Sequence, residues 1–228
     1  MALGAPSLAT ATVFQSSDSA TSGSFTPTAS ALLIAFSFGR ATATLGDPTI
    51  TDSEALSWSP LISGLYDIGS GTRIAARAFA TVIGPSPVAM TVTTEITTSG
   101  RTGLGLVQIT GHGGIPSNVA TAPDNSGDPV VTLDNTPATT SCVLAFLGAA
   151  GTTATVTPPS GFTEIDDSTD GGGLAFHSCY DNSSPPASVA YSTSDNQSVG
   201  IGIEIIQASS GGRIIARKGR RQLHFIIR

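Results

Sequence analysis

Short apolar runs separated by turn-forming residues recur along the whole chain. Residues 31–38 and 142–147 are almost continuously apolar, which is the pattern of strands buried on both faces. Residues 90–96 and 189–193 alternate apolar and polar positions, as a strand with one solvent-facing side does. No segment combines a helical apolar period with caps at both ends. The pattern therefore predicts an all-β chain built as a β-sandwich or jelly roll.

The predicted strands form two similar halves. Residues 26–36 align without a gap with residues 136–146, so that Pro27 matches Pro137 and Phe36 matches Phe146. Three further matches follow in the same order: residues 49–58 with 155–162, 74–79 with 174–179, and 103–109 with 200–206. Differences in length fall in segments rich in Gly, Ser and Pro, where loops tolerate change. We interpret the repeat as an internal duplication.

The duplication predicts two tandem β-sandwich or jelly-roll-like modules, at residues 1–112 and 128–208, joined by a linker at 113–127. A Gly/Ser hinge and an extended C-terminal arm follow at 209–228. Cys142 and Cys179 lie in apolar stretches, so we expect buried thiols rather than a disulfide. Matched apolar positions in the two halves predict these core residues: Phe36, Phe146, Trp58, Phe162, Ile109 and Ile205.

Charge separates the arm from the rest of the chain. Of the 10 Lys and Arg residues, six lie after Gly212, whereas all 16 Asp and Glu residues precede Arg213. The first 212 residues therefore carry a formal charge of −12, and the arm carries +6. Charged residues make up only 11% of the chain, against about 25% in ordinary soluble domains. So few solubilising charges favour a protein that is packed against neighbours.

The arm is not a simple polybasic tail, because apolar residues interrupt its charges. Contacts with nucleic-acid phosphates or with an anionic membrane are two possible roles, but the interleaved Ile and Phe residues and Gly219 favour neither. A strand added to the sheet edge of a protein partner uses both residue types. We therefore predict a partner-docking arm made of Arg213, Ile214, Ile215, Arg217, Lys218, Arg220, Arg221, Phe225, Ile226, Ile227 and Arg228.

Membrane and secretion signals are not expected. No run approaches the ~18 consecutive apolar residues of a membrane-spanning helix. The first residues have neither a basic region nor a long apolar core, so we expect no secretory signal.

Catalytic, metal and cofactor sites are not expected either. The three histidines, His112, His177 and His224, have no metal-ligand spacing, and no nucleophile elbow or phosphate loop occurs. Residues 166–171 match four positions of a calcium loop, but position 12 is His177 instead of glutamate. A hairpin turn explains the same residues, so Asp166 and Asp170 leave both interpretations open.

The two halves resemble β-sandwich modules of tailed-bacteriophage virion proteins. Each has an apolar Leu-Ile-Ala-Phe-type strand, a Thr-x-Thr segment followed by Trp or Phe, and a Gly-x-Gly closing strand. Residues 158–164, Pro-Pro-Ser-Gly-Phe-Thr-Glu, are similar to a recurrent turn in that class. The resemblance spans most of residues 20–208 with short motifs, and the arm has no counterpart in it.

The resemblance implies a non-enzymatic virion protein, either a capsid decoration or cement protein or another accessory head or tail component. Its partners would be other virion proteins, capsid or tail subunits, and we expect a homo-oligomer. The alternative is a receptor- or carbohydrate-binding module of a phage tail or fibre. Few aromatic residues are available to stack on sugars, chiefly Trp58, Tyr66, Tyr180 and Tyr191. A hydrolase is the least favoured reading.

Overall fold

The computed structural model describes residues 2–66, 72–124, 128–150, 156–192 and 197–209. The described residues form strands and loops without a helix, so the all-β prediction is confirmed. None of them lies in a helix of the length and apolarity needed to cross a bilayer. The strands are β1 (Ser7–Gln15), β2 (Ser19–Thr21), β3 (Leu32–Ala41), β4 (Thr49–Asp52), β5 (Ser59–Tyr66), β6 (Arg73–Val82), β7 (Val92–Glu95), β8 (Arg101–Ile109), β9 (Val119–Asp124), β10 (Val130–Thr132), β11 (Cys142–Ala149), β12 (Thr163–Thr169), β13 (Ala175–Asp181), β14 (Ser188–Ala190) and β15 (Ser198–Ile205).

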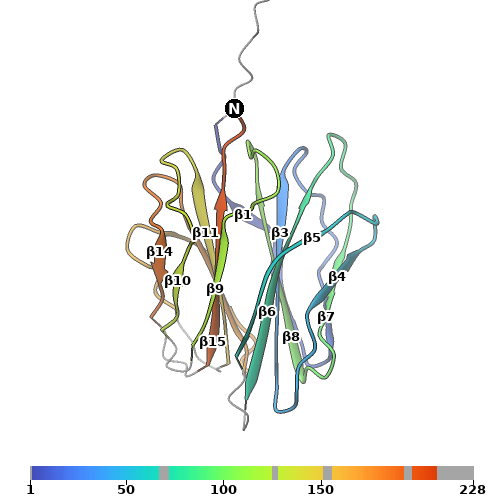
Figure 1. Cartoon of the computed structure of the whole chain (residues 1–228). Helices are drawn as coiled ribbons and strands as arrows, with labels where there is room; N and C mark the ends of the chain where they lie inside the picture. Colours follow the sequence, from blue (N-terminus) through green and yellow to red (C-terminus); the bar gives the residue numbers. More distant parts are fainter. Residues whose placement is uncertain (1, 67–71, 125–127, 151–155, 193–196, 210–228) are drawn as a thin grey trace, which may run out of the picture.

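The strands build four layers. Two five-stranded sheets, β1-β8-β3-β6-β5 and β12-β13-β11-β15-β9, pack face to face in the middle. A three-stranded sheet, β2-β7-β4, covers the outer face of the first, and the pair β10-β14 covers the outer face of the second (Figure 1). Every ladder among the described strands is antiparallel. Each half of the chain thus forms a sandwich, and the two sandwiches share an interface.

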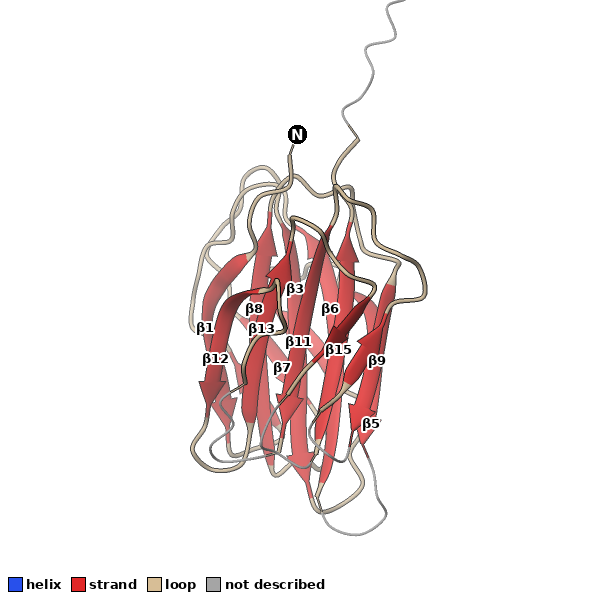
Figure 2. Cartoon of the chain, turned by 90° about the vertical axis from the view of Figure 1, so that its left-hand side faces the viewer, coloured by secondary structure: helices blue, strands red, loops and turns tan. Residues whose placement is uncertain are grey.

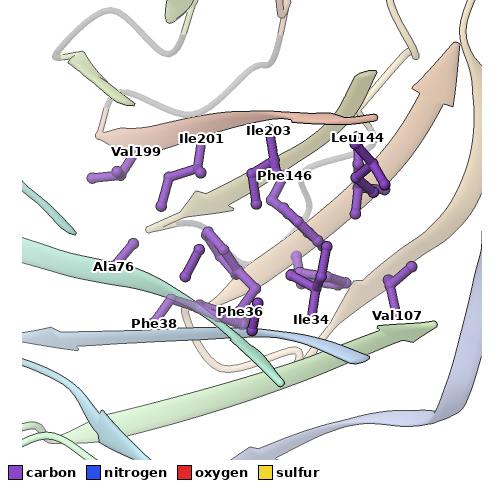
Figure 3. Close-up of a cluster of buried hydrophobic side chains, with 14 of the residues drawn as sticks. Ile34, Phe36, Phe38, Ala76, Val107, Leu144, Phe146, Val199, Ile201 and Ile203 are labelled. Carbon is purple, nitrogen blue, oxygen red and sulfur yellow. The ribbon is translucent and has the colours of Figure 1, made fainter. Parts of the chain in front are cut away.

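The largest core lies between the two five-stranded sheets. Side chains of β3 and β11 point toward one another there (Figure 3). The Phe36 and Phe146 rings stack with centroids 5.1 Å apart, and the Phe38 and Phe176 rings stack at 5.5 Å. All four of these rings are fully buried. Such aromatic pairs contribute about 0.5–1.5 kcal/mol beyond the area that they bury.

Each central strand also faces an outer core, which explains the continuous apolar runs. Ile34 and Phe36 of β3 face the other half, whereas Leu33 and Ala35 face the three-stranded sheet. Residues of β11 alternate in the same way between the middle core and the core under β10 and β14. A strand covered on both faces has no polar face to alternate with.

The two halves have the same strand order. β1, β8, β3, β6 and β5 of the first half occupy the places of β9, β15, β11, β13 and β12 in the second. Phe36 lies opposite Ala78 and Phe146 lies opposite Ser178, as the matched segments 74–79 and 174–179 require. These two pairs of matched segments therefore lie on corresponding strands of the two halves.

Hydrogen bonds at one turn repeat as well. The Thr28 N–H donates to Gln108 Oε1 at 2.9 Å, and the Ala138 N–H donates to Glu204 Oε1 at 2.9 Å. Within the same turns, the Ala31 N–H donates to the Thr28 carbonyl and the Ser141 N–H donates to the Ala138 carbonyl. The equivalence of the halves thus extends from strand order to individual main-chain contacts.

The predicted alignment of the closing strands was wrong by one residue. Phe36 lies opposite Gly105, but Phe146 lies opposite Ile201 rather than Gly202. A Cβ on Gly105 would lie 2.4 Å from the Phe176 ring in the middle core, whereas one on Gly202 would face Val131 in the outer core. The glycines of β8 and β15 thus make room for side chains on opposite faces, and their shared spacing misled the alignment.

The segment 113–127, expected to be a linker, contains β9. This strand pairs with β15 at the edge of the second five-stranded sheet, so that sheet begins at Val119. Pro123 and the small residues around it disguised this strand. Proline lacks an N–H and is tolerated at a sheet edge, where one side of the strand needs no ladder partner.

The predicted core is largely confirmed. Four of the six predicted residues, Phe36, Phe146, Ile109 and Ile205, are buried. Trp58 and Phe162 are partly buried and pack at the margins of the two outer cores, so they are boundary rather than central residues. Cys142 and Cys179 are buried free thiols, as expected.

Candidate functional site

The predicted docking arm, residues 213–228, lies outside the described residues. The last described residue is Ser209, which follows β15. Any surface in the described part that complements the arm must therefore be found from its own charge and geometry.

The part of the chain between Arg101 and the arm is acidic. Between Arg101 and Arg213 there are ten Asp and Glu residues and no Lys or Arg. Four of these acids fall on β12 and the turn that follows it: Glu164, Asp166, Asp167 and Asp170. This stretch is the most concentrated charge in the described structure.

β12 forms an outer edge of the second five-stranded sheet. It pairs with β13 on one side, and no described strand pairs with its other side (Figure 2). Beside it, in the first sheet, lies β1, which is likewise an edge strand. Glu164 and Asp167 of β12 are exposed. The unpaired edge of β12 is therefore lined with negative charge.

Two of the four carboxylates have partners in the first half of the chain. The Thr12 hydroxyl donates to Asp166 Oδ2 at 2.5 Å, and Arg101 Nη1 donates to Asp170 Oδ2 at 2.5 Å. The other oxygen of Asp170 accepts the N–H groups of Gly172, Gly173 and Leu174. Burial alone would raise the pKa of Asp170, but these hydrogen bonds and Arg101 hold it below its usual value. Asp166 and Asp170 thus tie β12 to the first half.

These contacts decide between the two interpretations of residues 166–171. Asp166 to Thr169 belong to a strand, and Asp170 begins the hairpin turn into β13. The hairpin reading therefore describes the geometry, and the chain itself supplies partners for the carboxylates. The described residues include no group of three or more His, Cys, Asp or Glu side chains placed to hold a metal ion.

The other two carboxylates, Glu164 and Asp167, lack a cationic arginine or lysine partner among the described residues. Burial raises the pKa of Asp167, and the nearby charges of Glu164 and Asp166 raise it further, although the Val156 N–H lowers it. Like charges close together disfavour ionisation of their neighbours. The free edge therefore carries negative charge that the described residues leave unneutralised.

The three histidines lie in unrelated places. His112 follows β8, bridges to Gln207 and accepts a hydrogen bond from the Gly114 N–H at its Nδ1. His177 lies on β13 in the outer core of the second half, and His224 lies outside the described residues.

His177 is the centre of a buried titratable cluster. Its ring meets the Tyr191 ring edge-on at 5.7 Å, and Cys179 Sγ lies 3.7 Å from Tyr191 Oη. Neither ring nitrogen of His177 has a hydrogen-bond partner among the described residues, and Nε2 is 3.6 Å from Glu164 Oε2. Burial lowers the pKa of His177 to about 4, partly offset by Asp166, and raises the pKa of Cys179 to about 12.

This cluster is not poised for nucleophilic catalysis. A cysteine nucleophile needs a lowered pKa and access to substrate, whereas Cys179 is fully buried and stays a thiol at neutral pH. His177 is fully buried and uncharged at that pH. Sequence reasoning did not connect these residues, although the spacing of two between His177 and Cys179 places both on one face of a strand.

Substitution of His177 by Phe is expected to reduce the loss of stability at acid pH. Unfolded histidine binds a proton near pH 6.5, but buried His177 does so only near pH 4. The unfolded state therefore binds more protons in this window, and stability falls as pH drops from 6.5 to 4, by on the order of 3 kcal/mol. Urea melts at pH 7 and pH 4.5 should show a smaller difference for His177→Phe than for the wild type.

The control for that experiment is His112→Gln, which changes a histidine in a loop outside the buried cluster. An unaltered pH dependence in His177→Phe would show that His177 does not govern acid sensitivity.

Trp58 borders a hollow on the outer surface of the first half. The hollow is lined by Ile50, Thr51, Asp52, Ala55, Leu56 and Trp58. The indole N–H donates to Asp52 Oδ2 at 2.8 Å, and Asp52 Oδ1 accepts the Glu54 N–H at 2.7 Å. Among the described residues that line this hollow, Trp58 alone is aromatic. The Asp52 carboxylate in this hollow already accepts hydrogen bonds from Glu54 and Trp58. The hollow therefore has few free polar groups with which to bind a sugar.

No protein family, curated protein or solved structure matches this chain.

Proposed function

We propose that this chain is a non-enzymatic structural protein of a bacteriophage particle, a capsid decoration or cement protein that docks through its C-terminal arm. The observation that carries the proposal is the separation of charge. The arm has six cations interleaved with Ile, Leu and Phe, and the first 212 residues have a formal charge of −12. Cations and apolar residues together need both an anionic surface and burial, which a protein partner provides.

The fold of the described residues supports a structural role. Four sheet layers enclose three large cores, and the four stacked rings of the middle core are fully buried. The titratable cluster at His177 is enclosed and has the wrong protonation states for acid–base or nucleophilic work near neutral pH. The resemblance of both halves to β-sandwich modules of tailed-phage virion proteins points to the particle as the place of action.

A decoration protein acts by mass action. A component that binds only the assembled shell raises the free energy of disassembly. Burying each of the large apolar side chains of the arm would contribute on the order of 1.5–3 kcal/mol before ordering costs. Exposed ion pairs add about 0–1 kcal/mol each and mainly accelerate and orient docking.

The proposal is tested on purified particles. Mass spectrometry of particles banded in a density gradient should find the chain in a fixed ratio to the main shell protein. Electron cryo-microscopy should place density for two packed sandwiches on the outer surface of the shell. Free chain in the lysate with none in the banded particles would refute the proposal. Density at the tip of a tail or fibre would instead support the receptor-binding alternative.

A further inference from the structure

We propose that the free edge of β12 receives the C-terminal arm of a second copy of this chain, paired antiparallel. The inference rests on the proposed docking role of the arm and names its acceptor. It starts from the one described sheet edge that carries clustered acids, namely Glu164, Asp166 and Asp167. The opposite side of the middle interface, at β5 and β9, has a single acid within these strands, Asp124 at the end of β9.

Charge makes this edge selective. Acidic residues at an edge strand normally prevent unwanted sheet pairing, because two like-charged edges repel each other. The same negative charges attract a strand that carries positive charges. Four cations fall within one five-residue stretch of the arm: Arg217, Lys218, Arg220 and Arg221. Their spacing along the chain is similar to that of the carboxylates on β12. Behind this edge, on β13, lies the fully buried His177, whose ring nitrogens have no hydrogen-bond partner in the described part of the chain; its Nε2 is 3.6 Å from Oε2 of Glu164. A cation brought to Glu164 would give this exposed carboxylate the positive partner that His177, uncharged near neutral pH, does not supply.

The apolar residues of the arm also have a place at this edge. Phe14 of β1 and Ile165 of β12 are only partly buried and form the margin of the middle core. In an extended arm, Leu223, Phe225 and Ile227 share one face, because side chains two apart point the same way. A strand added beside β12 would extend this margin and cover it.

Strand direction favours the arm of another copy over the chain's own arm. Ile205 pairs with Cys142, the neighbouring Val143 pairs with Asp181, and Tyr180 pairs with Thr163. β15 therefore ends at the end of the sheet where β12 begins. A chain that turned back from there along β12 would run parallel to it. All described ladders are antiparallel, and parallel pairing is somewhat weaker. A second copy can bring its arm in from the opposite end.

Such an interface joins different surfaces of the two copies. Each copy has one arm and one β12 edge, so the contact is heterologous and continues from copy to copy. Contacts of this kind close into a ring when the rotation permits and otherwise form an open row. Either arrangement would link decoration subunits to one another along a shell.

The test is hydrogen exchange on the full-length chain. The arm variant Arg217→Glu, Lys218→Glu, Arg220→Glu and Arg221→Glu should raise the exchange rate of β12 amides about tenfold or more relative to wild type. Amides of β5, the edge strand on the other side, serve as the internal control and should not change. Light scattering should show oligomers for the wild type and monomers for the variant.

A charge swap gives the decisive comparison. Adding Glu164→Lys and Asp167→Lys to the reversed arm should restore β12 protection and the oligomer mass, whereas these two changes with a wild-type arm should abolish both. Unchanged β12 exchange in the arm variant would overturn the inference, as would β12 protection in a monomer, which would indicate the chain's own arm. Loss of particle incorporation with unchanged β12 exchange would mean that the arm docks on another protein, so the inference would fail while the proposed function stands.

Discussion

If the proposed docking role holds, a chain truncated after Gly212 is expected to fold but to fail to incorporate into the particle. The described strands pair with one another and share three cores without any residue after Ser209, so circular dichroism should report an unchanged β-sheet spectrum. The truncation removes six cations together with the apolar side chains interleaved among them. Incorporation, measured as copies per particle by quantitative mass spectrometry, should fall about tenfold or more, since each 1.4 kcal/mol of lost binding is a factor of ten.

A second variant separates the contribution of charge from that of apolar surface in the arm. Substituting Ile214, Phe225 and Ile227 by Ser keeps all six cations but removes much of the apolar surface. We expect it to dock at low salt and to detach at physiological salt, because exposed charges alone are screened over about 8 Å there. Full incorporation of the truncated chain would contradict the anchoring role. An unfolded truncated chain would mean that the arm is a strand of its own sandwich.

Truncating either of the two stacked rings in the middle core should cost about 3–5 kcal/mol of unfolding free energy. Phe36 and Phe146 are fully buried and come from opposite halves of the chain. Replacement by Ala leaves a cavity between two sheets whose main-chain ladders limit collapse. Urea denaturation followed by tryptophan fluorescence of Trp58 measures the loss.

The double variant tests whether the two rings contact each other in solution. Centroids 5.1 Å apart should produce a coupling energy of about 0.5–1.5 kcal/mol, so the double change should cost less than the two single costs added together. Phe162→Ala is the control at a partly buried margin, with an expected cost of about 1–2 kcal/mol. Equal losses for Phe162 and Phe36 would show that the middle core is not the tighter one.

The hydrophobic pattern predicted the strands better than their arrangement. Continuous apolar runs identified β3 and β11 as buried on both faces, and the arrangement supplies two covering layers for each. The pattern could not predict which sheet covers which face of β3 or β11, because a Phe or Ile side chain is buried equally well against either sheet. β9 was missed because Pro123 and its small neighbours resemble a loop. An edge strand tolerates such residues, because one side of it needs no ladder partner.

The candidate acceptor could be predicted only in part. Composition alone revealed the basic arm and the acidic remainder of the chain. The spacing of Asp166, Ser168 and Asp170 resembled a calcium loop, because strands and such loops both place alternate oxygens on one side. The strand pairing with β13 is needed to show that these residues lie on a sheet edge. The folded structure is needed to show that Thr12 contacts Asp166 and that Arg101 contacts Asp170.

The shared middle core affects how the chain is made on the ribosome. The first half emerges before β11 and β13, and until they arrive the face of β3 with Phe36 and Phe38 has nothing to cover it. A half-made chain therefore presents an apolar sheet surface during the synthesis of about a hundred residues, at roughly 5–20 residues per second. Neighbouring nascent chains would associate through this apolar surface. Slower translation of the second half should therefore increase aggregation and lower the yield of folded protein.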